Sequence, residues 1–582
     1  MESLRLIDKI MYRPPLNRPS NRKTSLPIIG LDSEADTDGR TFIWCDSEGG
    51  VWEPTDLPDC LFTQRLRGQN AVVWNLRYEA TALIKLLPLD CQRYLRTTGN
   101  TIQGVYHWTI IGDKCLSIRR GKNTFHIYDL FGFYLASLNR AAQKYLNATK
   151  IEQDVTLYTT TYIQQNWHSI VEYCRQDAVL TRDLGLHLLR AFEAFGVYPG
   201  KLYSTAHVSW TYFRSKCVYV HVKRYWDNYP EVLRYALAAY NGGKFEVTRK
   251  GPGTYYEYDI VSAYPATIAK LIDIRKAEVS WTKRYLKNAT YSYLECIVKI
   301  PFSVHSPLPH KIGQLCTYPC GELWRVLTKS EYEYMRKAGC DITILSAVHL
   351  HTDDISYPYR DAIEELVRLK QSYKSDKDGL LYHTVKILLN SLYGKFCQLT
   401  PKDGKLKAGA AWNPVYASEI TSQTRLEITA MQQKFPQVVA VHTDSVIATE
   451  PLPIETGDQL GQWEASASGP GLILGSGVYQ IGNKSRLRGF KTPKPLLDLL
   501  PEKGDKCLIS RVAPRGWREI LHRKLPVEEM NRFVLQEKHL RVAFDRKRLW
   551  LEDWRNYSEV RQRTVESLPL VNLDWRPTRY DF

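Results

Sequence analysis

The chain has 582 residues, enough for about four domains of ordinary size, so a single small module is excluded. Its 44% hydrophobic residues can bury real cores, which also excludes a disordered or fibrous protein. The net charge of +17 and the 12% aromatic content suit a polyanionic partner with flat faces to stack on, such as a nucleic acid. A basic protein with a Tyr-rich core would have the same composition.

No stretch approaches the ~18 consecutive apolar residues of a membrane span, and the N-terminus lacks an apolar signal core. We therefore expect a cytoplasmic chain with no membrane partner. Cys316 and Cys320 are the most closely spaced of the 12 cysteines, but the nearby sequence offers no two further zinc ligands. We expect reduced thiols rather than a zinc site or disulfides.

The pattern along the chain predicts the following elements. Residues 1–25, rich in Pro and Arg, predict an extended arm, and an apolar run followed by acids at 25–39 predicts a strand. Apolar residues at helical spacing predict a long helix over 162–195, with a domain boundary near residue 195. Further along, 361–396 predicts two helices separated by SDKDG, and 437–450 predicts a hairpin whose turn is polar.

Acidic residues recur in the first third at spacings that share a face. Asp32 and Glu34 stand two apart on a predicted strand, so their side chains leave the same face. Two pairs stand four apart at helical spacing, namely Asn75 with Glu79 and Tyr173 with Asp177. Converging carboxylates could hold two cations ~3.5–4 Å apart and hydrolyse a phosphodiester. Taken singly, each pair is better explained as surface acids or a helix cap.

Three later segments suit phosphoryl transfer. YDIVSAYP places Asp259 at a strand end, and HTDS places Asp444 near the tip of the predicted hairpin. KILLNSLYGKF places Lys386, Asn390 and Tyr393 on one helical face. Two aspartates from separate strands can hold metal ions that bridge a triphosphate and an attacking hydroxyl, while a lysine offsets the charge.

The order of these motifs resembles the B-family DNA-dependent DNA polymerases. The resemblance rests on the acidic exonuclease motifs followed by D-x-x-S-x-Y-P, K-x-x-x-N-S-x-Y-G and x-T-D-S, and it runs from about residue 28 to 495. Within the family, YNGG at 240–243 and the wording NSLYGKF resemble the protein-primed subgroup of phage and linear-plasmid replicases. Each motif alone is weak, whereas six in this order are specific.

The resemblance implies a role for each matched residue. Asp259 and Asp444 resemble the catalytic metal ligands of the polymerase site. Residues matching contacts to the incoming nucleotide and nascent base pair are Tyr264, the expected steric gate against a 2′ hydroxyl, with Lys386, Asn390 and Tyr393. Residues matching the catalytic 3′–5′ exonuclease motifs are Asp32, Glu34, Glu79, Tyr173 and Asp177, with Asp32, Glu34 and Asp177 as metal ligands. Residues matching DNA contacts are Asn75, Ser137, Leu138, Tyr240, Gly242, Gly243, Thr421, Arg425, Arg486 and Arg488.

Five departures accompany the resemblance. His442 stands where the family has the first Asp of D-T-D-S, and we expect it near the site without binding metal. Glu79 replaces an Asp, which adds one methylene at the nuclease site, and Ala263 replaces a Leu. The subgroup's K-x-Y motif has only a weak match at Tyr479, preceded by Gly rather than Lys at 477. Only a short segment at 397–412 stands where the subgroup has its strand-displacing insertion, so strand displacement and processivity stay open.

The resemblance implies an α/β and α+β multidomain fold, with a ribonuclease-H-like 3′–5′ exonuclease domain and a right-hand polymerase domain of palm, fingers and thumb. The predicted boundaries are 1–25 N-terminal arm, 26–195 exonuclease, 196–270 first part of the palm, 271–352 an insertion able to dock a priming protein, 353–396 fingers, 397–412 second insertion, 413–500 second part of the palm and 501–582 a basic thumb.

The implied function is a template-directed DNA polymerase with proofreading that replicates viral or linear-plasmid DNA from a terminal protein. It would act as a monomer on primer-template DNA and dNTPs with two Mg²⁺ ions, or Mn²⁺, at each site. A viral enzyme would work in the host cytoplasm, and a linear-plasmid enzyme in an organelle. Two alternatives stay open: a nucleic-acid-primed repair or plasmid polymerase, and a decayed polymerase acting only as an exonuclease or DNA-binding factor.

Overall fold

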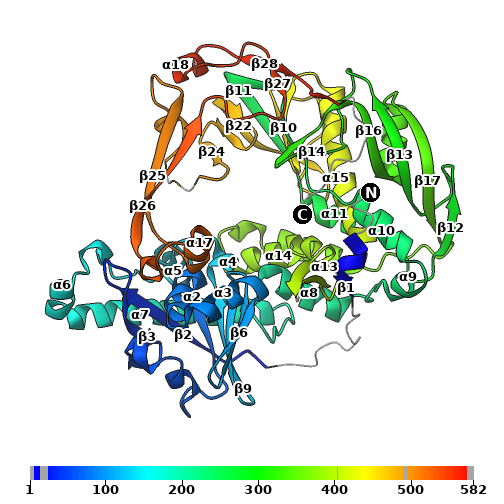
Figure 1. Cartoon of the computed structure of the whole chain (residues 1–582). Helices are drawn as coiled ribbons and strands as arrows, with labels where there is room; N and C mark the ends of the chain where they lie inside the picture. Colours follow the sequence, from blue (N-terminus) through cyan, green and yellow to red (C-terminus); the bar gives the residue numbers. More distant parts are fainter. Residues whose placement is uncertain (1–5, 13–23, 403, 491, 493, 573–582) are drawn as a thin grey trace.

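The protein is described from a computed structural model, which describes residues 6–12, 24–402, 404–490, 492 and 494–572. Figure 1 shows a ring of domains, with the blue and cyan N-terminal part at the bottom, the green and yellow middle of the chain at the right and top, and an orange hairpin at the left. No helix in the described part of the chain combines the length and apolar character needed to cross a membrane.

The N-terminal domain is an eight-stranded mixed sheet between two helices. The strand order is β4 (Val51–Trp52), β3 (Thr41–Asp46), β2 (Ile28–Ala35), β5 (Asn70–Val73), β9 (Asn123–Asp129), β8 (Cys115–Arg120), β7 (Tyr106–Ile111) and β6 (Asn100–Gln103). The three central strands β2, β5 and β9 are parallel, and their mostly apolar sequences fit a sheet covered on both faces. Helix α2 (Leu76–Lys85) covers one face and α7 (Trp167–Glu193) the other.

Helix α7 lies unusually close to β2. A Cβ atom at Gly30 would stand 1.7 Å from the carbonyl oxygen of Ala178, so only glycine permits this approach. The close packing carries the functional face of α7 up to the end of β2, where the paired acids stand. The predicted strand and long helix of this domain are therefore both present.

The palm is built on a second, largely antiparallel sheet. Its order is β10 (Phe245–Val247), β20 (Val438–His442), β21 (Ser445–Ala448), β11 (Arg249–Ile260), β22 (Trp463–Gly475), β23 (Val478–Ile481) and β24 (Lys484–Leu487). Helix α15 (Pro414–Lys434) packs against it, and helices α10 (Pro230–Ala239) and α11 (Ala263–Ile268) pack on α15. Asn413 caps α15 by accepting from the Tyr416 N–H at 3.2 Å, and Pro414 takes the first helical position.

Between the two parts of the palm the chain forms an inserted sheet and then the fingers. The inserted sheet contains β12 (Glu278–Thr282), β17 (Asp341–His351), β13 (Tyr291–Ile300) and β16 (Cys320–Thr328), with helix α12 (Lys329–Lys337) and the hairpin of β14 (His310–Ile312) and β15 (Leu315–Thr317). The fingers are α13 (Arg360–Ser372) and α14 (Leu380–Asn390), the two helices expected there. Helix α14 packs on α7 and on α8 (Thr205–Lys216), which joins the fingers to the N-terminal domain.

The second insertion is a short hairpin of β18 (Leu399–Lys402) and β19 (Lys405–Ala408). The described part of the N-terminal arm packs here: β1 (Ile10–Met11) pairs in parallel with β19. Ile7, Ile10 and Tyr12 are buried, so this part of the arm belongs to a core, while 1–5 and 13–23 lie outside the described residues. The remaining helices are α3 (Leu89–Thr98), α4 (Phe131–Tyr134), α5 (Leu138–Leu146), α6 (Thr160–Gln165), α9 (Lys223–Asn228), α16 (Leu496–Leu499) and α18 (Tyr557–Val560).

The thumb is shorter than the predicted span 501–582. It consists of the long hairpin β25 (Lys506–Pro514) and β26 (Phe533–Arg541), with helix α17 (Trp517–Arg523) at its tip. The chain then returns to the palm: β28 (Val565–Leu568) pairs with β11 and with β27 (Leu549–Trp550), and β29 (Val571–Asn572) pairs with β16. This return satisfies strand edges of the palm and insertion, a long-range pairing that local composition does not reveal.

The tip of the thumb is docked on the N-terminal domain. Trp517 and Ile520 of α17, with Met530, are buried in the same apolar cluster as helix α2. The Trp517 N–H donates to Thr81 Oγ1 at 3.2 Å, and Lys85 Nζ donates to three backbone carbonyls, including that of Met530 at 3.1 Å. These contacts close the ring seen in Figure 1.

Trp517→Ala should release the tip of the thumb. Trp517 is 1% exposed, so the truncation should cost about 3–5 kcal/mol through lost burial and the cavity left behind. We expect a lower calorimetric melting temperature and faster hydrogen exchange over residues 516–531. Trp281→Ala, at a 44% exposed position of β12, is the control and should change neither. Unchanged exchange at the tip in the Trp517 variant would contradict the docking.

Candidate active sites

Asp259 and Asp444 lie side by side on adjacent strands of the palm. Asp259 is the penultimate residue of β11, and Asp444 occupies the two-residue turn between β20 and β21. The strand register pairs Asp259 with Ser445, and the Ile260 N–H donates to the carbonyl oxygen of Asp444 at 2.9 Å. Two carboxylates brought together from distant parts of the chain form a site that suits hard divalent cations, whose preferred ligands are oxygens.

The electrostatics of this pair also suit a cation. Burial and the neighbouring Asp259 carboxylate raise the pKa of Asp444 to about 6. Lys484 of β24 partly offsets the charge, because its Nζ lies 3.6 Å from Asp259 and 2.6 Å from Glu257. Neither Lys484 nor Glu257 was expected from the motifs, since only the pairing of β24 with β23 brings that lysine back to the site.

His442 takes no part in the carboxylate pair. Its ring is buried and stacks on Tyr479, with centroids 5.0 Å apart and planes 10° apart, and its Nε2 accepts from the Gly477 N–H at 3.3 Å. Burial, followed by the cations Lys547, Arg488 and Lys484, lowers the pKa of His442 to about 3, so the ring is neutral at physiological pH.

The carboxylates stand at one end of a cavity of about 910 Å³ between the palm and the fingers. The fingers line it with Lys370, Lys374, Lys377, Tyr382, Lys386 and Asn390. Tyr264 of α11 also lines it and lies against Tyr393, with ring centroids 4.1 Å apart. Of the predicted nucleotide-site residues, Tyr264, Lys386 and Asn390 line the cavity and Tyr393 lies against Tyr264. No motif indicated the further lysines Lys370, Lys374 and Lys377.

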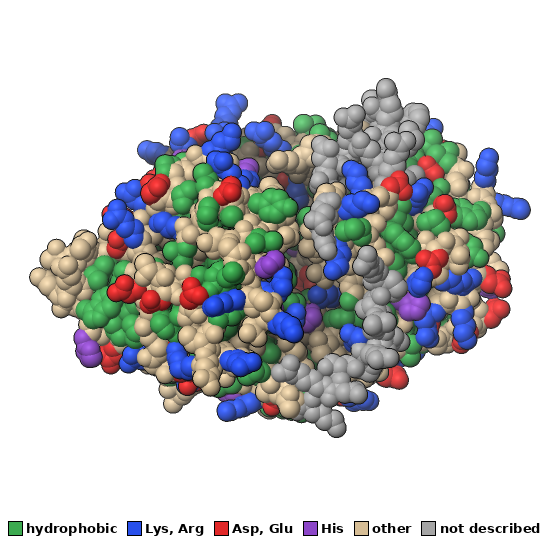
Figure 2. Space-filling view, turned by 60° about the horizontal axis from the view of Figure 1, so that its bottom comes forward, with side chains coloured by type: hydrophobic (Ala, Val, Ile, Leu, Met, Phe, Trp, Pro, Cys, Tyr) green, Lys and Arg blue, Asp and Glu red, His purple; other side chains and the backbone are tan. Residues whose placement is uncertain are grey.

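The basic pair Arg486 and Arg488 reaches the same cavity from the palm. Arg486 belongs to β24, and the guanidinium of Arg488 lies 4.3 Å from the ring centroid of Phe245. On the face drawn in Figure 2, by contrast, Lys and Arg side chains are spread among acidic and apolar ones rather than gathered in one patch. The cavity itself is lined by several cationic side chains, including Lys370, Lys374, Lys377, Lys386, Lys484, Arg486 and Arg488.

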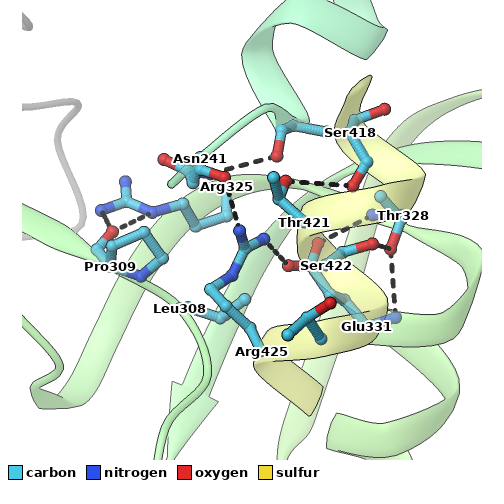
Figure 3. Close-up of polar contacts among 12 residues, drawn as sticks. Asn241, Leu308, Pro309, Arg325, Thr328, Glu331, Ser418, Thr421, Ser422 and Arg425 are labelled. Carbon is cyan, nitrogen blue, oxygen red and sulfur yellow. Dashed lines mark hydrogen bonds and ion pairs between the residues drawn. The ribbon is translucent and has the colours of Figure 1, made fainter. Parts of the chain in front are cut away.

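Arg425 and Thr421 differ from the prediction of direct DNA contact. Both are 0% exposed, and Figure 3 shows them inside a polar network between α15 and α12. Arg425 pairs with Glu331 at 2.6 Å and donates to the carbonyl of Asn241 at 2.7 Å and to that of Gly242 at 2.9 Å. Arg425 therefore positions the YNGG segment, and its burial leaves no face for DNA.

The YNGG segment, residues 240–243, adjoins the two-residue turn that carries Asp444. A Cβ atom at Gly243 would stand 2.8 Å from Cγ2 of Thr443, so glycine permits the contact, and the Thr443 N–H donates to the Lys244 carbonyl at 2.7 Å. Gly242 is exposed, and Tyr240 lies close to Tyr393 and Tyr264, whose hydroxyl groups help to raise its pKa after burial. The segment therefore connects the turn to the insertion.

The second acidic site lies in the N-terminal domain, where β2 meets α2 and α7. Asp32 and Glu34 leave the same face of β2, while Glu79 and Asp177 reach them from the two helices. Burial first, and then the other carboxylates, raises the pKa of Asp32, and burial and Asp177 raise that of Glu34 to about 8. Oε2 of Glu79 and Oδ1 of Asp177 are buried without a hydrogen-bond partner. Buried carboxylates arranged in this way fit a bound cation.

One cation of the chain stands at this site. Lys150 forms an ion pair with Asp177, and its Nζ lies 4.4 Å from the ring centroid of Tyr173. No motif pointed to Lys150, which precedes α7 in an irregular segment. Cys174 was also missed, although its Sγ approaches Asp32 and Glu34.

The residues predicted to contact single-stranded DNA differ in how far their side chains are exposed. Asn75 and Ser137 are exposed at the starts of α2 and α5, where Ser137 accepts from the Arg140 N–H at 3.3 Å. Leu138 is buried in the core and cannot contact DNA directly, because its side chain packs inward from the first turn of α5. Cys316 and Cys320 lie in β15 and at the start of β16, and all 12 cysteines are free thiols.

Comparisons with known proteins agree with this arrangement. Residues 151–408 match the model of the family "DNA polymerase type B, organellar and viral". Phi29 DNA polymerase in an orthorhombic crystal form has 15% sequence identity and a TM-score of 0.63, with 89% of this chain and 100% of that chain covered. Its ternary complex with primer-template DNA and incoming nucleotides gives 14% identity and 0.62, with the same coverage.

A complex of Phi29 DNA polymerase with single-stranded DNA gives 16% identity and a TM-score of 0.57, covering 78% of this chain and 86% of that chain. No curated protein sequence matches the chain. At these identities the structural likeness concerns the fold, which is the multidomain fold expected from the motifs. Residues 151–408, less than half of the chain, match the type B DNA polymerase family model, and the chain as a whole has the multidomain fold of the Phi29 DNA polymerase structures.

Proposed function

We propose that this chain extends primer-template DNA from dNTPs at the palm site and removes mispaired 3′ ends at the site in the N-terminal domain. The observation that carries the proposal is the pairing of Asp259 with Asp444 at the end of a lysine-lined cavity. The decayed-polymerase alternative is disfavoured because this pair, Tyr264 and Lys386 all keep a common cavity despite the change at His442.

At the palm site the protein would bind and orient both substrates. Divalent cations held by Asp259 and Asp444, Mg²⁺ or Mn²⁺, would supply Lewis-acid activation of the primer 3′ hydroxyl and of the triphosphate. The cavity lysines, Lys386 above all, would offset the triphosphate charge, and Lys484 holds the carboxylates in place. Tyr264, held by Tyr393, would lie under the incoming sugar and exclude a 2′ hydroxyl.

At the exonuclease site Asp32, Glu34, Glu79 and Asp177 would hold the cations used for phosphodiester hydrolysis. Lys150 supports this role, because it offsets the charge of Asp177 in the metal-free protein and stands where the anionic phosphate would enter. Asn75 and Ser137, both exposed beside the site, are the proposed contacts to the single-stranded 3′ end.

For priming we propose a terminal protein docked on the insertion 271–352, in a monomeric polymerase that replicates viral or linear-plasmid DNA. The insertion supports this, since it forms a folded sheet with its own apolar core. The short β18–β19 hairpin favours the alternative of nucleic-acid priming. The site of action would be the host cytoplasm for a virus, or an organelle for a linear plasmid.

Separate variants should remove the two activities independently. Asp444→Asn should lower nucleotide incorporation more than about 10²-fold, because metal-bound charge stabilisation amounts to several kcal/mol, and should leave 3′ degradation intact. The double variant Asp32→Asn with Glu34→Gln should do the reverse, so each variant serves as the control for the other. Primer extension with dNTPs, and degradation without them, measures both. Loss of both activities in one folded variant would contradict two separate sites.

Sugar selection tests Tyr264. Tyr264→Ala should raise incorporation of ribonucleotides relative to deoxyribonucleotides by about tenfold or more, because the ring would no longer fill the space of the 2′ hydroxyl. Tyr264→Phe keeps the ring and its contact with Tyr393 and should retain the selection. The ratio of kcat/KM for the two sugars is the measurement, and an unchanged ratio in the Ala variant would remove Tyr264 as the gate.

A further inference from the structure

The exonuclease site contains a thiol among its carboxylates. One ligand atom each from Asp32, Glu34 and Cys174 lies within 4.8 Å of the other two, and this is the one such group of three among the described residues. Two ligands of one ion cannot be farther apart than the sum of their bond lengths, about 4.4 Å for sulfur and oxygen on zinc. At the tetrahedral angle of zinc the sulfur–oxygen distance is about 3.6 Å, so a closure of about 1 Å at most would bring all three onto one ion.

The packing explains why the thiol faces the acids. Cys174 and Asp177 stand three apart on α7 and share the face that Gly30 allows to approach β2. Cys174 is 0% exposed and lies behind the carboxylates, whereas Asp32 is partly exposed and gives an ion a way in. Lys150 pairs with Asp177, and in the part of the chain that the structure describes no ion pair joins a Lys, Arg or His to Asp32 or Glu34.

Two independent features indicate that the group of Asp32, Glu34 and Cys174 would be stabilised by a bound cation. A carboxylate oxygen of Asp32 and one of Glu34 lie within 4.8 Å of each other, and two negative charges this close repel unless a cation lies between them. Next to them, Oδ1 of Asp177 and Oε2 of Glu79 are buried without a partner, although both residues are more than nine-tenths buried. These buried oxygens show that the surroundings of the group also have unmet demand for positive charge or hydrogen-bond donors.

We propose that Cys174 Sγ is a protein ligand, with Asp32 and Glu34, for a divalent cation in the exonuclease site. On binding, the Cys174 thiol releases its proton to solvent and the sulfur electron pair forms the metal–sulfur bond, with no change in oxidation state. A sulfur ligand selects softer ions that accept it, such as Co²⁺, Zn²⁺ and Cd²⁺, over Mg²⁺, which prefers oxygen. The inference deepens the proposed exonuclease function and rests on it for its biological meaning.

Titration of the metal-free full chain with Cd²⁺ or Co²⁺ tests the proposal without any nuclease assay. We expect a near-ultraviolet sulfur-to-metal charge-transfer band that Cys174→Ala removes, together with Cd²⁺ affinity at this site lower by more than about tenfold. Cys45→Ala is the matched control: Cys45 is equally buried and stands opposite Asp32 on β3, yet lies outside the ligand group, so the band should stay. Other thiols contribute equally to every variant.

Two further variants keep the outcome decisive. Asp32→Asn should weaken the same band, since thiol and carboxylate share one ion. Cys174→Ser fills nearly the same volume and should also lose the band while circular dichroism shows a folded chain, which separates lost ligation from lost folding. A band that survives Cys174→Ala, or that ignores Asp32→Asn, would overturn the proposal.

The nuclease assay separates this inference from the function on which it rests. Degradation of a 3′ end by the wild-type chain, with no thiol-dependent band, would overturn the inference alone. A band without degradation under any of the ions would contradict the proposed exonuclease and leave Cys174 as a metal ligand.

Discussion

The polymerase half of the molecule depends on holding two like charges together. Asp259 and Asp444 come from opposite sides of the fingers in sequence, and only the pairing of β11 with β21 places them side by side. Repulsion between them, together with burial, raises the pKa of Asp444, so the metal-free site stores a cost that bound cations would relieve. Lys484 and the lysines of the fingers offset the negative charge of that pair. The close contact at Gly243 supports the turn that carries Asp444.

The N-terminal domain also holds negatively charged side chains close together, but with different structural elements. There the carboxylates come from a parallel strand and two helices, and a close helix–sheet contact at Gly30, rather than a hairpin turn, sets their spacing. Of the departures from the family pattern, Glu79 keeps a carboxylate at the exonuclease site, and His442 falls beside the palm carboxylates without replacing either of them. His442 is accommodated as a neutral ring stacked on Tyr479, so its substitution leaves the carboxylate pair complete.

The sequence predicted features that depend on residues close together in the chain. The two-residue spacing of Asp32 and Glu34, the helical spacing of Lys386 and Asn390 and the polar hairpin turn at Asp444 are present, because periodicity determines which face a side chain leaves. Tyr393, expected on the same helical face, lies beyond the end of α14 in a short 3-10 turn. Lys484, Lys150 and Cys174 escaped notice since their positions depend on how distant elements pack. Arg425 was misassigned for the same reason: a motif does not show whether a cation faces DNA or a buried glutamate.

The docked tip of the thumb has a topological consequence. Palm, thumb, N-terminal domain and fingers are joined in a closed circuit, the last contact being Trp517 against the core beneath α2. A duplex held inside such a circuit could enter only by threading a free end or after the tip detaches. Linear DNA would therefore enter more readily than covalently closed circular DNA. The strength of the Trp517 contact would determine the size of this difference.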